Sequence, residues 1–414
     1  MFVAIRNAAR DYAWGSHTAI AEFLGAEPSG GPEAELWLGA HAGSPAEIVD
    51  AEAVGAEDLA QLIAGNPGLA LGPEHAREGA RLPFLLKVLA AARPLSLQAH
   101  PTPEQARLGF AREEAEGVPI DAFDRNYRDP YAKPELIVAV SGTFEALSGF
   151  RPLEEVRAVL TVLREADAAS DDPQPGALDL LASRLDGPEP LREAVAWLLQ
   201  DGRGGDSGEA AWLIERTIAL AGTARALESS YAASFRTVLD LADEYPGDPG
   251  IVISLLLNRV TLRRGDALFL DAGNIHAYLS GLGIELMAAS DNVLRGGLTP
   301  KHVDIPELLE VLDFAPMEPP LLPAAEIAPG VLEYRPPVPE FTLLRIEGAS
   351  DDLRLPLSGP AVILAEGGRV EVSGRHGSIE LGRGGAAFAS PDETELSVTG
   401  EGTAWVATVP PAVA

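Results

Sequence analysis

Two polar residues that could bind a metal ion stand close together in an otherwise apolar segment. In Leu95-Ser96-Leu97-Gln98-Ala99-His100-Pro101, apolar and polar residues alternate. If this segment is a strand, its two-residue period places Gln98 and His100 on the same face. An amide oxygen and an imidazole placed in this way can form half of a metal site. An edge strand with two solvated polar groups would give the same pattern.

A third candidate ligand, His276, follows a pair of turns. Gly265 is followed by a short apolar run and then by Asp271-Ala272-Gly273-Asn274-Ile275-His276. This order of turn, strand, turn and histidine resembles the second metal motif of cupin-type jelly rolls. That family usually has Pro where this chain has Asp271, which is a difference at the turn and not at the ligand.

A fourth candidate ligand is Glu135, which stands just before an apolar run in Lys133-Pro134-Glu135. A carboxylate at the mouth of a buried strand needs a partner, because an isolated buried charge is costly. A divalent cation would be such a partner. Two His, one Glu and one Gln form a mixed nitrogen and oxygen set that suits Zn²⁺ and leaves room for water or substrate. The chain has no Cys, so a thiolate site is excluded.

The lysines of this chain are rare and stand beside these motifs. Only three occur among 31 basic residues, namely Lys87, Lys133 and Lys301. Each lies next to a second polar motif, which favours sites that need a compact, titratable ammonium group and not a guanidinium. Chance placement is the simpler alternative.

Several longer runs together resemble type I mannose-6-phosphate isomerases. The resemblance rests on residues 95–101, on Lys133-Pro134-Glu135, on residues 273–281 and above all on residues 285–301, which run from Glu285 to Lys301. Residues 12–15, 34–39 and 149–152 resemble further signatures of that family, in the expected order. The last 90 or so residues carry no distinctive motif.

The resemblance implies a zinc-dependent isomerase that interconverts mannose 6-phosphate and fructose 6-phosphate, with one Zn²⁺ per chain. It implies an active-site arginine at Arg295 and zinc ligands at Gln98, His100, Glu135 and His276. One departure matters: many members have His immediately before Lys-Pro-Glu, and this chain has Ala132. If that His has a catalytic role in other members, the role is absent in this chain or another residue fulfils it.

Moving a carbonyl between C1 and C2 passes through an enediol or enediolate, so the site needs a base, an acid and a stabiliser of oxyanion charge. Arg295 is permanently cationic and can stabilise the enediolate or bind phosphate. The candidates for acid and base, which the sequence does not rank, are Asp291, Glu285 and Lys133. If residues 291–295 are helical, Asp291 and Arg295 share a face.

The substrate phosphate also needs hydrogen-bond donors and positive charge. The best available donors are Ser96, Lys87 and Lys301. For Lys87, a lysine at the end of a strand with its ammonium in solvent is an equally good interpretation.

Two other functions fit part of this pattern. A cupin-like sugar-phosphate sensor would keep the four ligands but would not need Arg295, Asp291 and Lys133 as well. A cupin-type glucose-6-phosphate isomerase is generally smaller and lacks a helical insertion. A fused nucleotidyltransferase is disfavoured because the chain has no Walker-type glycine loop.

The elements that must position these residues fall into three stretches. Residues 36–39 and 82–86 are predicted to be strands. Thr102 together with Gln105 predicts a helix with a capping box at its start. Helical periodicity dominates residues 151–246. After residue 250 strand signals return, including the apolar run 251–257 and a strand-turn-strand over 262–270. Short strands are expected at 361–364, 370–372, 378–381, 386–389, 396–398 and 404–409.

We therefore expect a mainly β protein with a helical insertion. Residues 1–150 and 247–320 would form a cupin-like jelly-roll catalytic domain, residues 151–246 an α-helical domain, and residues 321–414 a C-terminal β-sandwich or jelly roll. At 414 residues the chain is long enough for two or three domains.

Composition limits the partners of the chain. The formal net charge is −31, so neither nucleic acid nor an anionic membrane is an expected partner, and an anionic substrate needs local positive charge. The first residues do not resemble a signal peptide, and no apolar stretch reaches membrane-spanning length. We expect a cytoplasmic monomer that acts on a small sugar phosphate.

Overall fold

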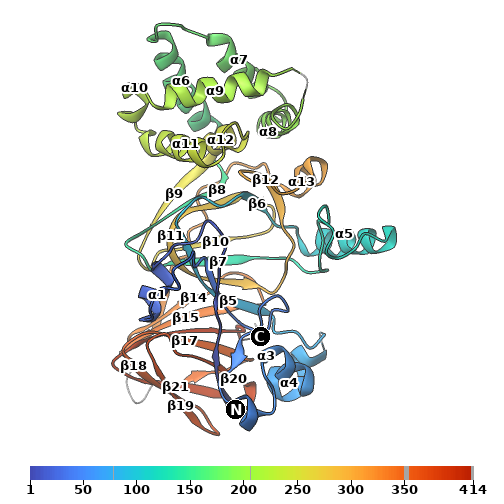
Figure 1. Ribbon diagram of the computed structural model, residues 1–414, viewed down its shortest axis with the longest axis vertical. Coiled ribbons are helices and arrows are strands. Elements are labelled where there is room, and N and C mark those ends of the chain that lie inside the picture. Colours follow the sequence, from blue (N-terminus) through green and yellow to red (C-terminus); the bar gives the residue numbers. More distant parts are fainter. Residues whose placement is uncertain (78, 206, 349–353, 412–414) are drawn as a thin grey trace.

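The computed structural model describes residues 1–411 apart from 78, 206 and 349–353. The described chain is elongated, with helices at one end, a large sheet in the middle and two further sheets at the other end (Figure 1). No helix in the described part is long and apolar enough to cross a bilayer.

The middle of the molecule is a ten-stranded antiparallel sheet, which we call the central sheet. Strand β11 (His276–Ala288) divides it into two arms, because residues 281–288 pair with β5 and residues 276–280 pair with β8. The lower arm holds β2 (Ala9–Arg10), β3 (Glu35–Leu38), β5 (Phe84–Ala91), β7 (Glu135–Ala139) and β10 (Ala267–Leu270). The upper arm holds β6 (Leu97–Ala99), β8 (Thr143–Phe150), β9 (Leu257–Arg263) and β12 (Leu294–Gly297).

The inner faces of the two arms pack against each other. Leu89 and Ile137 of the lower arm share an apolar cluster with Phe144, Leu262 and Tyr278 of the upper arm. The neighbouring residues on β5, Val88 and Ala90, belong to a different cluster, because alternate strand residues point to opposite faces. This apolar cluster, which we call the apolar plug, fills one end of the space between the arms, and the polar residues that are candidates for the functional site line the other end.

Residues 151–246 are helical, as their periodicity predicts, and this helical region packs on the outer face of the upper arm. Its helices are α6 (Leu153–Ala168), α7 (Pro175–Arg184), α8 (Pro190–Gly202), α9 (Glu209–Ala221), α10 (Ala224–Leu227), α11 (Ala232–Glu244) and α12 (Gly250–Ile253). The expectation of strand at 251–257 is wrong for residues 251–256, and only Leu257 belongs to a strand, as the first residue of β9. This run is α12 followed by a 3₁₀ turn, Ser254–Leu256. A buried apolar run has no periodicity to separate helix from strand.

The third region consists of two sheets packed face to face around an apolar cluster. The larger sheet contains β13 (Ala325–Ala328), β14 (Val331–Tyr334), β15 (Thr342–Glu347), β17 (Ala361–Gly367), β20 (Ala386–Ala389) and β22 (Thr403–Thr408). The smaller contains β16 (Leu355–Pro356), β18 (Arg369–Ser373), β19 (Ser378–Gly382) and β21 (Glu395–Gly400). All six strands expected between 361 and 409 are confirmed.

The larger C-terminal sheet also takes in the N-terminus of the chain. Strand β1 (Phe2–Arg6) pairs with β20, and β4 (Glu47–Ile48) pairs with β1. Nothing in the sequence of these short strands indicates a partner almost 400 residues away. The two ends of the chain are therefore joined in one sheet.

The remaining helices flank these sheets. They are α1 (Ala19–Leu24), α2 (Ala51–Val54), α3 (Leu59–Gly65), α4 (Pro67–Arg77), α5 (Pro103–Glu116) and α13 (Ile305–Val311). Helix α5 has the predicted capping box, since Thr102 accepts from the amide of Gln105 and the Gln105 side chain accepts from Thr102. Helix α5 projects from the side of the molecule (Figure 1).

Candidate metal centre and catalytic cleft

Strand register places three candidate residues in one row across the upper arm. His276 of β11 lies opposite Gln98 of β6, and Gln98 lies opposite Arg295 of β12. Directly opposed residues of antiparallel strands project to the same side of the sheet. The three side chains therefore belong to the same face, between the two arms.

The other arm contributes Glu135, the first residue of β7. Its carboxylate oxygens lie 3.3 Å from His100 Nε2 and 3.4 Å from His276 Nε2. Candidate ligand atoms of these three residues all lie within 4.8 Å of one another, and all three side chains are buried. The fold thus brings together three of the four predicted ligands, and the strand register sets Gln98 beside His276.

Hydrogen bonds fix the tautomers of both histidines. His100 Nδ1 lies 2.8 Å from the carbonyl oxygen of Asn292, and His276 Nδ1 lies 3.0 Å from that of Asn274. A carbonyl can only accept, so each Nδ1 carries the proton and each Nε2 keeps a lone pair. Both Nε2 atoms are buried without a hydrogen-bond partner. Two lone pairs directed at one carboxylate are a poor arrangement without a cation, and they fit a divalent metal.

Shifted pKa values give His100 and Glu135 the protonation states that metal binding requires. Burial, the largest effect, lowers the pKa of His100 to about 4, so its imidazole is neutral at pH 7. Burial by itself would raise the pKa of Glu135. The positive charge of Lys133 and the contacts with the two histidines outweigh it and hold that pKa well below the usual range. A neutral imidazole and an ionised carboxylate are the forms that coordinate Zn²⁺.

The predicted lysines occupy different positions. Lys133 Nζ lies 2.9 Å from Glu135, beside the metal cluster. Lys87 is buried on the inner face of β5, 2.9 Å from Glu285 and 3.4 Å from Glu35. Burial would lower the pKa of Lys87, but these carboxylates raise it, so it stays charged. Burial raises the pKa of Glu285.

A group of cations without carboxylate partners lies near the metal cluster. Among the described residues, Arg128, Arg295 and Lys301 form no ion pair with a carboxylate; Arg295 is half-buried, whereas Arg128 and Lys301 are exposed. Burial lowers the pKa of Arg295, and neighbouring Arg128 lowers it further. Burial, Arg295 and Arg128 lower the pKa of Lys301. Three neighbouring cations without carboxylate partners are an arrangement that suits an anion. Ser96, half-buried, stands two residues before Gln98 on the chain.

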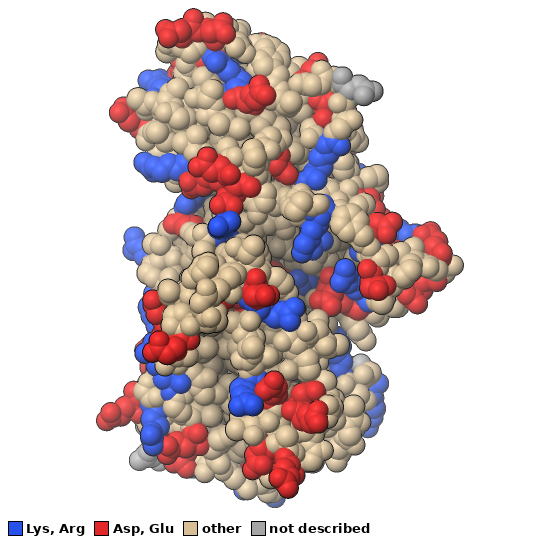
Figure 2. Space-filling view, viewed as in Figure 1, with Lys and Arg blue, Asp and Glu red and all other residues tan. Residues whose placement is uncertain are grey.

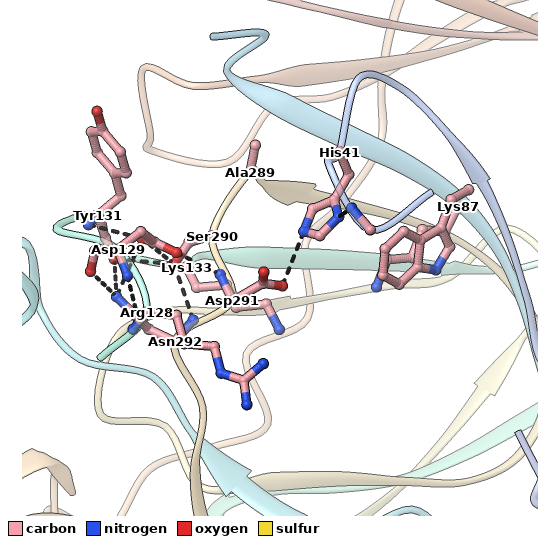
Figure 3. Close-up of polar contacts among 12 residues, drawn as sticks. His41, Lys87, Arg128, Asp129, Tyr131, Lys133, Ala289, Ser290, Asp291 and Asn292 are labelled. Carbon is pink, nitrogen blue, oxygen red and sulfur yellow. Dashed lines mark hydrogen bonds and ion pairs between the residues drawn. The ribbon is translucent and has the colours of Figure 1, made fainter. Parts of the chain in front are cut away.

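Asp291 lies at the open side of this group, on a loop and not on a helix. Residues 289–293 are irregular and Arg295 is on β12, so the helical pairing of Asp291 with Arg295 is wrong. The Asp291 side chain is 46 % exposed and its Oδ1 lies 3.0 Å from Nε2 of His41 (Figure 3). Burial would raise the pKa of Asp291, but His41, Lys133 and Arg128 together lower it.

Asn292 holds the loop of Asp291 in place. Its side-chain oxygen accepts from the amide of Arg128, and its amide nitrogen donates to the carbonyls of Asp129 and Tyr131 (Figure 3). Its own backbone carbonyl accepts from His100. A single buried residue therefore connects the loop of Arg128, the loop of Asp291 and one metal-ligand candidate.

Sequence reasoning missed His41 and Arg128. Both lie in loops, whose partners depend on tertiary structure and not on local periodicity. A signal was nevertheless present, since His41 follows closely after the signature at residues 34–39 and Arg128 shortly precedes Lys133.

Comparisons with known proteins agree with this architecture. Residues 2–153 match the family model of the type I phosphomannose isomerase catalytic domain. The chain is 37 % identical over 400 residues to mannose-6-phosphate isomerase of Escherichia coli strain K12, covering 96 % of each, and 32 % identical over 411 residues to the Homo sapiens enzyme, covering 94 % and 93 %. A zinc-bound structure of mannose 6-phosphate isomerase superposes with a TM-score of 0.85 at 32 % identity, over 99 % of both chains.

The fold and the cluster define a protein of several antiparallel sheets with a helical middle region and a buried His/Glu/His site. Because relatives above 30 % identity match nearly the whole chain, this protein belongs to the type I phosphomannose isomerase family.

Proposed function

We propose that this chain interconverts mannose 6-phosphate and fructose 6-phosphate, with one Zn²⁺ bound by Gln98, His100, Glu135 and His276. The observation that carries the proposal is the buried His100–Glu135–His276 cluster, with both Nε2 atoms free of hydrogen bonds, in a chain similar to these isomerases along its whole length. Bound zinc supplies a Lewis acid that stabilises negative charge on oxygen.

The cations next to the cluster hold the phosphate and the reacting oxygens. Lys301 and Arg128 carry unpaired positive charge for the phosphate, together with Ser96 as a hydroxyl donor. Arg295 lies beside Gln98 in the sheet, so its guanidinium stabilises the oxyanion that develops at the reacting carbons. Lys87 is already paired with Glu285 and Glu35, so a phosphate must compete with two carboxylates for its ammonium group.

The structure supports Asp291 as the base more than its rivals. Its carboxylate is ionised, partly exposed and close to the cations, whereas Glu285 is buried in an ion pair with Lys87. Asp291 takes the proton from C2 of the open-chain aldose. The C–H electron pair forms the C1=C2 bond, and the carbonyl pair moves to O1 to give the enediolate.

In the second half of the reaction Asp291 returns its proton to C1, and the electron pair of the C1=C2 bond forms the new C1–H bond. The hydroxyl proton of O2 passes to O1, and the carbonyl then stands at C2 of the ketose. Lys133, with its ammonium near Asp291 and Glu135, can give and receive protons at the oxygens.

The finer division of the fold is part of the same proposal. The central sheet with its facing arms (residues 1–150 and 247–320) is a cupin-like jelly roll, residues 151–246 are a helical domain, and residues 321–414 are a second cupin-like β-domain. Arms that pack on a shared apolar plug, with a polar ligand set at the open end, support this division.

A coupled assay tests the function. The protein is supplied with mannose 6-phosphate before and after treatment with a strong chelator, and fructose 6-phosphate is measured. Turnover that is lost with zinc and restored by Zn²⁺ supports the proposal. Binding without turnover would indicate a sensor, and turnover of glucose 6-phosphate in preference to mannose 6-phosphate would indicate the other isomerase.

A further inference from the structure

His41 has an environment that fixes both of its ring nitrogens. It begins a tight turn in which the amide of Ser44 donates to the His41 carbonyl. The amide of Gly43 donates to Nδ1 at 3.0 Å, so Nδ1 carries no proton. The remaining proton is on Nε2, which donates to Asp291 Oδ1 at 3.0 Å.

The ring is also held in place by packing. His41 lies edge-on to Trp37, with 4.7 Å between ring centroids, and its side chain is only 15 % exposed. Trp37 is in turn held by a hydrogen bond from Nε1 to Glu35. The loop after β3 therefore presents a neutral imidazole N–H, in one orientation, to a carboxylate 250 residues away (Figure 3).

The other groups around Asp291 are charged. Lys133 and Arg128 face it from the loop that leads into β7, and the Asp129 carboxylate accepts from the Asp291 backbone amide at 2.8 Å. Lys133 and Arg128 act on the Asp291 carboxylate through charge, whereas His41 acts on it through a hydrogen bond, which is directional. The hydrogen bond from His41 occupies Oδ1, and Oδ2 has no hydrogen-bond partner among the described residues.

We propose that His41 is a positioning residue for catalysis: its Nε2–H holds the Asp291 carboxylate in the orientation in which Oδ2 takes the substrate proton. This inference rests on the proposed function and adds a residue to it. It also bears on Ala132, which leaves the segment before Lys133 without the histidine that many family members have. In this chain the imidazole that contacts the Asp291 carboxylate belongs to the loop after β3.

The test compares two variants of His41 with one matched control. His41→Ala removes the donor, and we expect kcat to fall about 10- to 100-fold, the effect of losing one hydrogen bond to a charged group, with KM and bound zinc nearly unchanged. His41→Gln keeps a donor and should recover much of kcat. His17→Ala, at an exposed histidine, should leave all three quantities unchanged.

The pH profile separates positioning from a general structural effect. Because His41 lowers the pKa of Asp291, its loss should move the acid limb of kcat/KM to higher pH. In an Asp291→Asn background the His41→Ala change should have almost no further effect on kcat, since the partner is already gone.

Two results would overturn the proposal. A His41→Ala enzyme with normal kcat and an unmoved acid limb would exclude the role, and so would full, additive losses in the double variant. An unmodified protein that does not isomerise mannose 6-phosphate would contradict the proposed function itself, so the two failures are distinguishable.

Discussion

The protonation of single side chains decides what this site can bind. Two carbonyl groups fix the proton of His100 and of His276 on Nδ1, and Lys133 keeps Glu135 ionised. We expect chelation to remove activity and Zn²⁺ to restore it. His276→Ala should lower bound zinc below one per chain, measured by atomic absorption, whereas His376→Ala in the C-terminal region should not. Full activity in verified metal-free protein would contradict zinc dependence.

Arg295 should act on the reaction and not on the metal. It lies beside Gln98 but has no carboxylate partner in the described chain, so its charge is available to the substrate. Arg295→Ala should leave zinc near one per chain while kcat falls by about two or more orders of magnitude. The exposed Arg263→Ala variant is the control. Loss of zinc together with activity would show that Arg295 supports the metal site instead.

Replacing each of the three lysines by arginine separates proton transfer from phosphate binding. Arginine keeps the charge but cannot exchange a proton at pH 7. If Lys133 transfers protons, Lys133→Arg should be nearly as damaging as Lys133→Ala. Lys301→Arg should keep much of kcat and mainly raise KM, because phosphate accepts either cation. Lys87→Arg should behave like Lys301→Arg if Lys87 serves the phosphate. Steady-state kinetics across pH separate these cases, and near-normal kcat in Lys133→Arg would remove Lys133 from proton transfer.

At the scale of elements, the site depends on loops that Asn292 joins. Both hydrogens of its amide group are donated to carbonyl groups, so the isosteric Asn292→Asp change places a carboxylate against Asp129 and Tyr131. We expect a loss of about 1–3 kcal/mol in the free energy of unfolding. Zinc affinity should fall about tenfold, because the loop that carries Asn292 would shift and its backbone carbonyl, which orients His100, would shift with it.

A matched change elsewhere provides the control. Among the described residues, the Asn66 side chain forms a hydrogen bond through its oxygen alone, which accepts from the amide of Leu69 at the start of α4. Asn66→Asp keeps that acceptor and should be neutral or slightly stabilising. Chemical unfolding of both variants measures the free energy of unfolding, and zinc titration measures the zinc affinity. Equal effects at the two positions would mean that Asn292 does not organise the loops.

The same elements show how far the sequence could predict the structure. Local rules were sufficient for the capping box of α5, for the helices between 151 and 246 and for the strands after 361, because periodicity and caps are short-range signals. They failed at residues 251–257, where burial on all sides removes the periodicity. The family motifs indicated the metal-ligand candidates. The contact between His41 and Asp291 joins two loops that are far apart in the sequence, so neither loop's own sequence could predict it.

At the scale of the whole molecule, a strongly acidic protein must attract an anionic substrate. The net charge is −31, so the general field opposes a sugar phosphate. Figure 2 shows basic side chains around the recess in the middle of this face, between the two ends of the molecule. The cations of the cleft, Arg128, Arg295 and Lys301, repel one another and have no carboxylate partner in the described residues. The proposed site therefore concentrates positive charge that has no carboxylate partner in the described chain.

The central sheet and the larger C-terminal sheet share one core, so they should unfold together. Leu86 and Val138 of the central sheet belong to the same apolar cluster as Phe388 and Trp405 of the C-terminal sheet. Trp405 is fully buried, stacks on Tyr334 and donates from Nε1 to Glu366.

We expect Trp405→Ala to lower the free energy of unfolding by about 3–5 kcal/mol, the usual effect of removing a buried aromatic ring. Because the cluster spans both sheets, zinc release and the loss of secondary structure should follow one transition, shifted to lower denaturant concentration. Trp212, which is 40 % exposed on α9, gives the matched control, and Trp212→Ala should change stability by less than about 1 kcal/mol. Circular dichroism and a zinc-sensitive dye measure the two signals in the same titration. If Trp405→Ala unfolds the C-terminal sheets while zinc stays bound, the two regions are separate units and the shared core does not couple them.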